Sequence, residues 1–230
     1  MKNNAKLLNG VLIIGLCGGG SWAQGQIDDD DDWFGQDPQE TFNAINEGEL
    51  SFLEKPPQNP VHHHHNTLIV LPESIETGWV NLVQCHENLD RFPSAQIVYN
   101  KDKVRNIILT SQKNIGHAWV EGPSVQLTNV KKDARLCIKA ETRALIAQSD
   151  GSFIMKNGPF MRKFLDGYFP MRVSMNIKLP KGMSFVSIEP KEQKGFTVVK
   201  GKQGIHFDAW FEGRLTTRIH LKLDAQTRIQ

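Results

Sequence analysis

The sequence lacks the short motifs by which many enzymes are recognised. It contains no Gly-x-Ser-x-Gly, no His-Glu-x-x-His and no phosphate-binding loop, which mark serine hydrolases, zinc proteases and nucleotide-binding enzymes. It also contains no Cys-x-x-Cys, and therefore no Cys-x-x-Cys-His, which excludes a thioredoxin-type exchanger and a covalently attached haem. These absences favour a protein that works without catalysis.

Long hydrophobic runs are absent as well. The apolar stretch Leu7–Cys17 has about half of the roughly 20 residues that a membrane-spanning helix needs. Two lysines precede it and the small residues Ser21 and Ala23 follow it, which is the layout of a secretory signal peptide cleaved after Ala23. We therefore predict that residues 1–23 are a signal peptide and that the protein is periplasmic or secreted, with no transmembrane span. The alternative to this signal peptide is a lipoprotein that is lipidated at Cys17. Leu16, directly before the cysteine, argues against it.

Charge is distributed unevenly along the chain. Residues 24–55 carry a net charge of −9 and residues 56–230 a net charge of +9, although the whole chain carries only +2. The five-aspartate run Asp28–Asp32 repels itself and cannot pack, and the prolines between residues 56 and 60 stiffen the chain. Residues 24–65 are predicted to be an acidic, partly disordered arm that ends in a Pro/His-rich linker. In an exported protein the basic body is not expected to bind nucleic acid. The charge split favours an acidic arm that lies against its own domain, or solvation of both parts, and the candidate partner is an envelope protein or a glycan.

From Asn66 onward the sequence alternates apolar and polar residues in short runs separated by Gly, Pro, Asn and Asp. This pattern predicts an all-β fold, an antiparallel β-sandwich-like structure with one or two small sandwich regions. The first β region is expected over residues 66–156 and the second over residues 171–224, followed by a tail over residues 225–230. The expected strands are 67–71, 79–85, 96–99, 104–110, 118–121, 124–127, 135–143, 171–179, 196–199, 205–211 and 215–223.

Residues 157–170 interrupt the alternation. Pro159 suits the first position of a helix, Phe160 and Phe164 are spaced by one helical turn, and Gly167 suits its end. We expect a short helix here that joins the two β regions.

The last two expected strands read as a β-hairpin. A three-residue loop over 212–214 would place Phe207 opposite Ile219 and His206 opposite His220, with apolar side chains on one face only. A two-residue loop would set apolar residues against polar ones, so the pattern selects the longer loop.

Two cysteines remain after removal of the predicted signal peptide, Cys85 and Cys137. An even number in an oxidising compartment predicts a disulfide between them. A thiolate at Cys85 activated by His86 is disfavoured, because neighbours in a strand point to opposite faces.

Four consecutive histidines follow the proline-rich linker. Imidazole nitrogens bind divalent transition metals such as Cu²⁺, Ni²⁺ and Zn²⁺, but an extended backbone sends alternate rings to opposite sides. His86 and Glu87 follow the strand that is expected to end at residue 85, and they could supply two further ligands. The alternative is that these histidines are structural or lie at a polar linker. The candidate metal ligands are His62, His63, His64, His65, His86 and Glu87.

Basic and aromatic residues gather around the expected helix, at Arg162, Lys163, Tyr168 and Arg172. They are a candidate groove for an anionic polymer, a glycan or a peptide. The alternative is that they form the rim of an apolar joint.

Together these patterns predict an exported, non-catalytic protein that acts by binding or assembly in the cell envelope. The alternative is a periplasmic metal-binding protein that uses the histidine run and a divalent transition metal. A second alternative is an unrecognised hydrolase, although nothing singles out a carboxylate pair such as Glu87 and Asp90.

Overall fold

The computed structural model describes residues 12–13, 48–164, 167–201 and 203–224. Most of the predicted signal peptide, residues 24–47 of the predicted arm and the tail after residue 224 lie outside this set. The described chain is almost entirely β-strand, with the four-residue helix α2 (Ser74–Thr77). The predicted all-β, sandwich-like class is therefore confirmed. No helix in the described ranges is long and apolar enough to cross a membrane.

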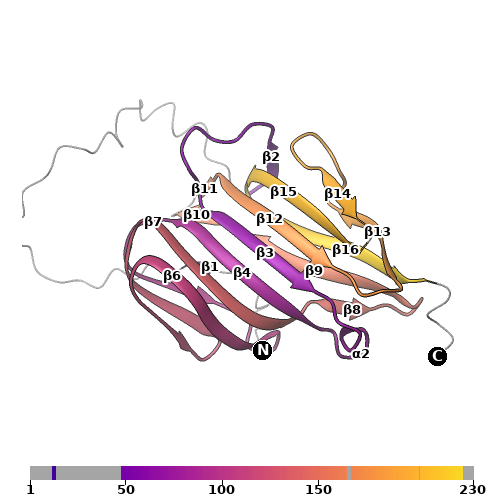
Figure 1. Ribbon diagram of the computed structural model, residues 1–230. Coiled ribbons are helices and arrows are strands. Elements are labelled where there is room, and N and C mark those ends of the chain that lie inside the picture. Colours follow the sequence, from indigo (N-terminus) through magenta and orange to yellow (C-terminus); the bar gives the residue numbers. More distant parts are fainter. Residues whose placement is uncertain (1–11, 14–47, 165–166, 202, 225–230) are drawn as a thin grey trace, which may run out of the picture.

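The strands form one large and one small sheet (Figure 1). The large sheet runs in the order β1 (Leu12–Ile13), β5 (Phe92–Val98), β7 (Ser124–Arg143), β4 (Trp79–Leu89), β3 (His63–Ile69), β12 (Met171–Lys178), β15 (Gly204–Glu212) and β14 (Val198–Gly201), with β2 (Ser51–Leu53) on β15 and β6 (Val104–Glu121) on β7. The small sheet runs β13 (Met183–Glu189), β16 (Leu215–Leu223), β9 (Ser152–Phe160) and β8 (Leu145–Ala147). A separate pair is made by β10 (Arg162–Phe164) and β11 (Gly167–Phe169).

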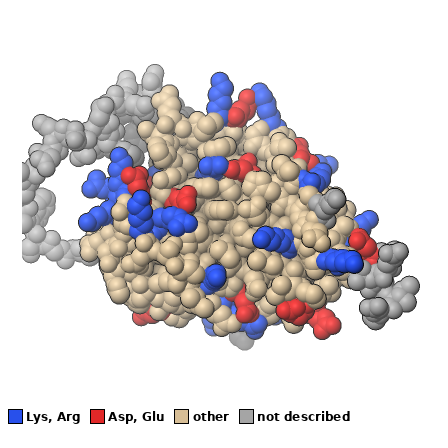
Figure 2. All heavy atoms as spheres, in the orientation of Figure 1, with Lys and Arg blue, Asp and Glu red and all other residues tan. Residues whose placement is uncertain are grey.

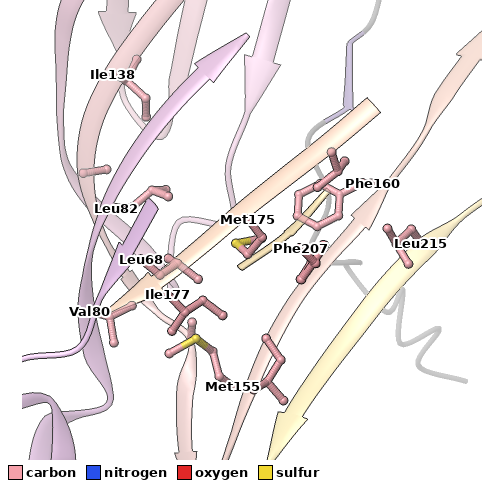
Figure 3. Packing of buried hydrophobic residues seen from close by; sticks show 14 of the residues in the cluster. Leu68, Val80, Leu82, Ile138, Met155, Phe160, Met175, Ile177, Phe207 and Leu215 are labelled. Atoms are coloured by element: carbon pink, nitrogen blue, oxygen red, sulfur yellow. The ribbon is translucent and has the colours of Figure 1, made fainter. Parts of the chain in front are cut away.

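The core lies between the two sheets. Met175, Ile177 and Phe207 of the large sheet pack toward Met155 and Leu215 of the small sheet (Figure 3). On β15 alternate residues are buried, and on β12 only the buried Ser174 interrupts the same alternation, as period-two patterning leads us to expect. Burial of each such side chain contributes about 1.5–3 kcal/mol.

The two predicted β regions meet in one sheet. Strand β3 pairs in parallel with β12 on one side and antiparallel with β4 on the other. Buried residues from both regions belong to the same hydrophobic cluster. The parallel contact between β3 and β12, far apart in the chain, therefore joins the two halves of the described structure.

The prediction of a helix over residues 157–170 is wrong. Strand β9 continues to Phe160, which pairs with Leu215 of β16, and the residues after it form the β10–β11 pair. Gly158 has φ +90°, and a Cβ there would collide with the carbonyl oxygen of Leu215. Phe164 contacts Phe92 and Phe169 instead of a helical neighbour. Sheet pairing thus overrides a local helical spacing.

The predicted terminal hairpin is also wrong. Strand β15 pairs with β12, β14 and β2, whereas β16 pairs with β13 and β9 in the other sheet. Phe207 and Ile219 are both buried, but they enter the core from opposite sheets. The alternation of apolar residues specifies which face of each strand is buried, but it does not specify which other strand pairs with it.

Two expected breaks between strands are absent. The chain runs through β6 and β7 as single long strands, which pair along their length with shifts of register. Asn106, Asn114, Asn129 and Asp133 have positive φ, a conformation that Asn and Asp tolerate better than most residues. Asn114, Asn129 and Asp133 lie in the expected breaks, where Asn and Asp indicate turns, whereas Asn106 lies inside an expected strand. All four mark irregularities inside continuous strands.

The predicted disulfide is present. Cys85 on β4 lies opposite Cys137 on β7, and the two sulfur atoms are bonded. The bridge spans 52 residues of sequence. Closing a loop of that length in the unfolded chain stabilises the fold by about 4 kcal/mol in the chain-entropy account.

Candidate functional site

The histidine run lies in the middle of the large sheet, so its assignment to a linker is wrong. His63–His65 are part of β3, and His62 accepts a backbone hydrogen bond at its carbonyl oxygen from Arg172. The predicted alternation is confirmed, because His62 and His64 are 5% and 2% exposed while His63 and His65 are half-buried on the outer face. An imidazole has an apolar ring as well as polar nitrogens, which lets it occupy an inward position when its nitrogens find partners.

Three histidine rings stack on the inner face of the sheet. His62 and His64 on β3 lie beside His86 on β4, with ring centroids 5.3 Å apart for the His62–His86 pair and 4.3 Å for the His64–His86 pair. Phe160 from the small sheet meets the His64 ring edge-on at 5.1 Å. The inner histidine cluster, defined as His62, His64 and His86, is therefore enclosed between the sheets.

Hydrogen bonds determine the tautomer of His86. The side-chain oxygen Oε1 of Gln84 accepts from the Tyr99 hydroxyl at 2.6 Å and lies 3.2 Å from His86 Nε2. An amide oxygen only accepts, so His86 Nε2 carries the proton and its Nδ1 is an acceptor. His62 Nε2, 3.1 Å away, then donates to that Nδ1.

The same amide extends the network. Gln84 Nε2 donates to Asn66 Oδ1 at 3.1 Å. A chain of polar side chains therefore runs through the interior across β3, β4 and Tyr99, at the end of β5, with His86 neutral and directionally fixed.

Burial keeps all three inner histidines uncharged. Desolvation lowers the pKa of His62 to about 4, with the charge of Asp90 opposing this effect and that of Arg162 adding to it. Desolvation also lowers the pKa of His64 and of His86 well below the ordinary value of 6.5, and each is lowered further by its neighbouring histidines.

The outer face of the same strands carries a second polar set. His63 Nε2 lies 2.6 Å from Ser174 Oγ and its Nδ1 lies 3.6 Å from Glu87 Oε2. Glu87 also accepts from Arg135 at 3.0 Å. Burial lowers the pKa of His63, and the nearby charge of Arg172 lowers it further.

Farther along this face, Arg172 donates to Asp208 at 2.9 Å and lies over the Trp210 ring. The hydrogen bond to Asp208 raises the pKa of Arg172. Figure 2 shows acidic side chains beside basic ones at several places on the face in view, together with basic side chains that stand alone and wide stretches that carry neither. The outer face of the large sheet therefore carries paired charges around Glu87 and Asp208.

The six predicted metal ligands do not converge. His62, His64 and His86 face inward, while His63, His65 and Glu87 belong to the outer face, and the His65 ring contacts Asn176. Across the described residues, no group of three or more His, Cys, Asp or Glu side chains is arranged to hold a metal ion.

The predicted basic–aromatic surface is divided among separate partners. Arg162 binds both carboxylate oxygens of Asp90, at 3.1 and 2.7 Å. Tyr168 is 9% exposed, with Lys163 Nζ 5.4 Å and the Arg214 guanidinium 5.5 Å from its ring centre. Arg172 is paired with Asp208. The cations that were expected to line one groove therefore contact different partners.

Sequence reasoning missed a pocket between the sheets. It has a volume of about 110 Å³ and is lined by β3 and β4, by residues 99–104 and 142–144, and by residues 156–160 at the end of β9. Asn66 and Gln84, buried members of the polar network, face it from the large sheet. We call this space the interior pocket. One feature of the sequence could have indicated this pocket. Asn66 and Gln84 are each two residues from the buried Leu68 and Leu82, so they point to the same inner face of the strands.

Some buried polar atoms near this region have no hydrogen-bond partner among the described residues. They are His64 Nε2, Asn157 Nδ2 and Thr217 Oγ1. Asn157 lines the interior pocket and pairs in register with Thr217. Because buried polar groups are nearly always bonded, these atoms distinguish this part of the interior from an ordinary apolar core.

Comparison with known proteins adds no family. The sequence matches no protein-family model, and no curated protein is significantly similar to it.

The inner histidine cluster predicts that the protein loses stability in mild acid. The unfolded chain takes up protons below about pH 6.5, whereas folded His62 does so only near pH 4, so stability falls as the pH drops from 6.5 toward 4. Each such ring contributes up to about 1.4 kcal/mol per pH unit. Urea unfolding at pH 7 and pH 5 should show a clearly lower midpoint at pH 5.

A matched pair of variants isolates the cause. His64→Phe should reduce the loss between pH 7 and pH 5, since it removes one titrating ring from the interior. His117→Asn removes an exposed ring and should leave the loss unchanged. Equal urea midpoints at both pH values in the wild-type protein would contradict the assignment.

Proposed function

We propose that the protein is exported and acts without catalysis, by binding a ligand or partner in the cell envelope. The observation that carries this proposal is the interior pocket, where buried amides and a phenol adjoin apolar walls. Among its lining residues there is no carboxylate, histidine or thiol, so it lacks three of the side-chain types that act as general bases, and lysine is the basic type that lines it. Burial raises the pKa of Tyr99, which keeps that phenol protonated as a hydrogen-bond donor.

The catalytic groups weighed from the sequence are engaged elsewhere. Cys85 is in the disulfide, Glu87 is paired with Arg135, and Asp90 is paired with Arg162. Groups held in this way position strands and loops. A binding role fits this arrangement better than hydrolysis.

Two independent features support export. The signal-peptide layout over residues 1–23 directs a chain to the secretory pathway, and disulfides persist in oxidising compartments. The pairing of Cys85 with Cys137 between adjacent strands agrees with that destination.

Intact mass spectrometry without reduction tests the location and the disulfide together. Protein isolated from the cell envelope should begin at Gln24 and lack the two thiol hydrogens of Cys85 and Cys137. Ala23→Arg should block cleavage because the position before the cut requires a small residue. Recovery of the wild-type chain with its first 23 residues attached, inside the cell, would contradict export.

Ligand-observed NMR with a library of small polar compounds tests the binding role. We expect compounds that bind the mature protein, remain chemically unchanged and are lost in Thr142→Phe, which fills the interior pocket. Val199→Ala, at an exposed position of β14, is the control and should retain them. Turnover of a bound compound would indicate an enzyme, and hits unaffected by Thr142→Phe would move the site elsewhere.

Metal binding is the alternative function, because three imidazole side chains lie close together between the sheets, although their stacked arrangement in the described structure is not that of a metal site. Titration of the mature protein with Cu²⁺, Ni²⁺ and Zn²⁺ tests it. The alternative requires a dissociation constant on the order of 10 µM or tighter, which is lost in His62→Ala/His64→Ala/His86→Ala and kept in His63→Ala/His65→Ala. Weaker binding, or equal binding by both variants, removes it.

A further inference from the structure

The interior pocket carries charge of one sign. Lys103, Arg143 and Lys156 line it, and none of its lining residues is acidic. Within the described part of the chain no ion pair joins any of these three cations to a carboxylate. By contrast, the cations Arg162 and Arg172 of the surface predicted from sequence both have acidic partners.

Backbone hydrogen bonds hold these cations in neighbouring places. The Arg143 amide donates to the Lys103 carbonyl at 2.8 Å, and the Lys156 amide donates to the Ala144 carbonyl at 3.1 Å. Three segments of the chain therefore meet at one side of the pocket. Glu141, two residues before Arg143, is bonded to Arg105 and Asn106 instead.

The inside of the pocket offers a donor and an apolar surface. Asn157 contributes the buried Nδ2 that has no partner among the described residues. Leu68, Leu82 and Phe160 contribute apolar walls. An oxygen atom of a ligand would satisfy the amide, and an apolar body would cover the walls.

We propose that the interior pocket binds a small carboxylate with a compact apolar body. Its carboxylate oxygens lie toward the cations and Asn157, and its apolar part lies against Leu68, Leu82 and Phe160. The pocket volume of about 110 Å³ is smaller than the cavity of about 150 Å³ that holds benzene, which limits the ligand to a short chain. This inference rests on the proposed binding function and adds the class of ligand.

Calorimetric titration with three compounds of similar size tests the charge. Butyrate should bind the mature, disulfide-bonded protein about tenfold more tightly than butyramide, and butylammonium should bind more weakly than both. The preference should shrink as salt is raised from 20 to 500 mM (about 20 Å and 4 Å of screening length) because the cations lie near solvent. Lys103→Gln/Arg143→Gln/Lys156→Gln should bring the butyrate affinity down to that of butyramide and leave butyramide unchanged.

A second triple variant controls for net charge. Lys131→Gln/Lys132→Gln/Lys181→Gln removes the same charge at positions that do not line the pocket, and it should keep the preference for butyrate. Equal affinities for butyrate and butyramide, or a preference that survives the first triple variant, would overturn the carboxylate proposal. Absence of butyrate binding would also overturn it. Compounds that are lost in Thr142→Phe would still support the binding function, so the two proposals fail separately.

Discussion

The position of β3 between β4 and β12 is the constraint on which the rest of the described structure depends. Its backbone bonds to neighbours on both sides, so its side chains must point either into the sandwich or to the outer face. Because β3 is an early strand and β12 a late one, their parallel contact also joins the two halves of the chain. The histidine run is thereby divided between two environments.

The inward-facing histidines make part of the interior between the two sheets polar. His62, His64 and His86 lie where an apolar side chain would satisfy the packing, and all three remain neutral. Gln84 anchors His86, and His86 in turn bonds to His62. A buried polar network of this kind is costly when incomplete. Next to it, the interior pocket combines a buried amide with three cations that have no acidic partner among the described residues, and our binding proposal rests on this combination.

Much of the fold was predictable because it follows from local geometry. The alternation along β12 identified its buried apolar residues, and the even number of cysteines identified the Cys85–Cys137 pair. The helix at 157–170 and the β15–β16 hairpin could not be judged locally, since Phe160 and Leu215 find their partners across the small sheet. The candidate site was predictable only in part. The sequence singled out the histidines, but Gln84, Asn157 and Lys156 carried no motif.

The sequence by itself determined the all-β class, the face of each alternating strand and the opposite directions of neighbouring histidines, because these follow from the extended backbone of single segments. Only the tertiary structure decided which face of β3 is the interior, which strands are neighbours, and that residues 66, 103, 143 and 157 surround one space. Such contacts join residues far apart in the chain, and their selection depends on packing and loop closure that no local pattern contains.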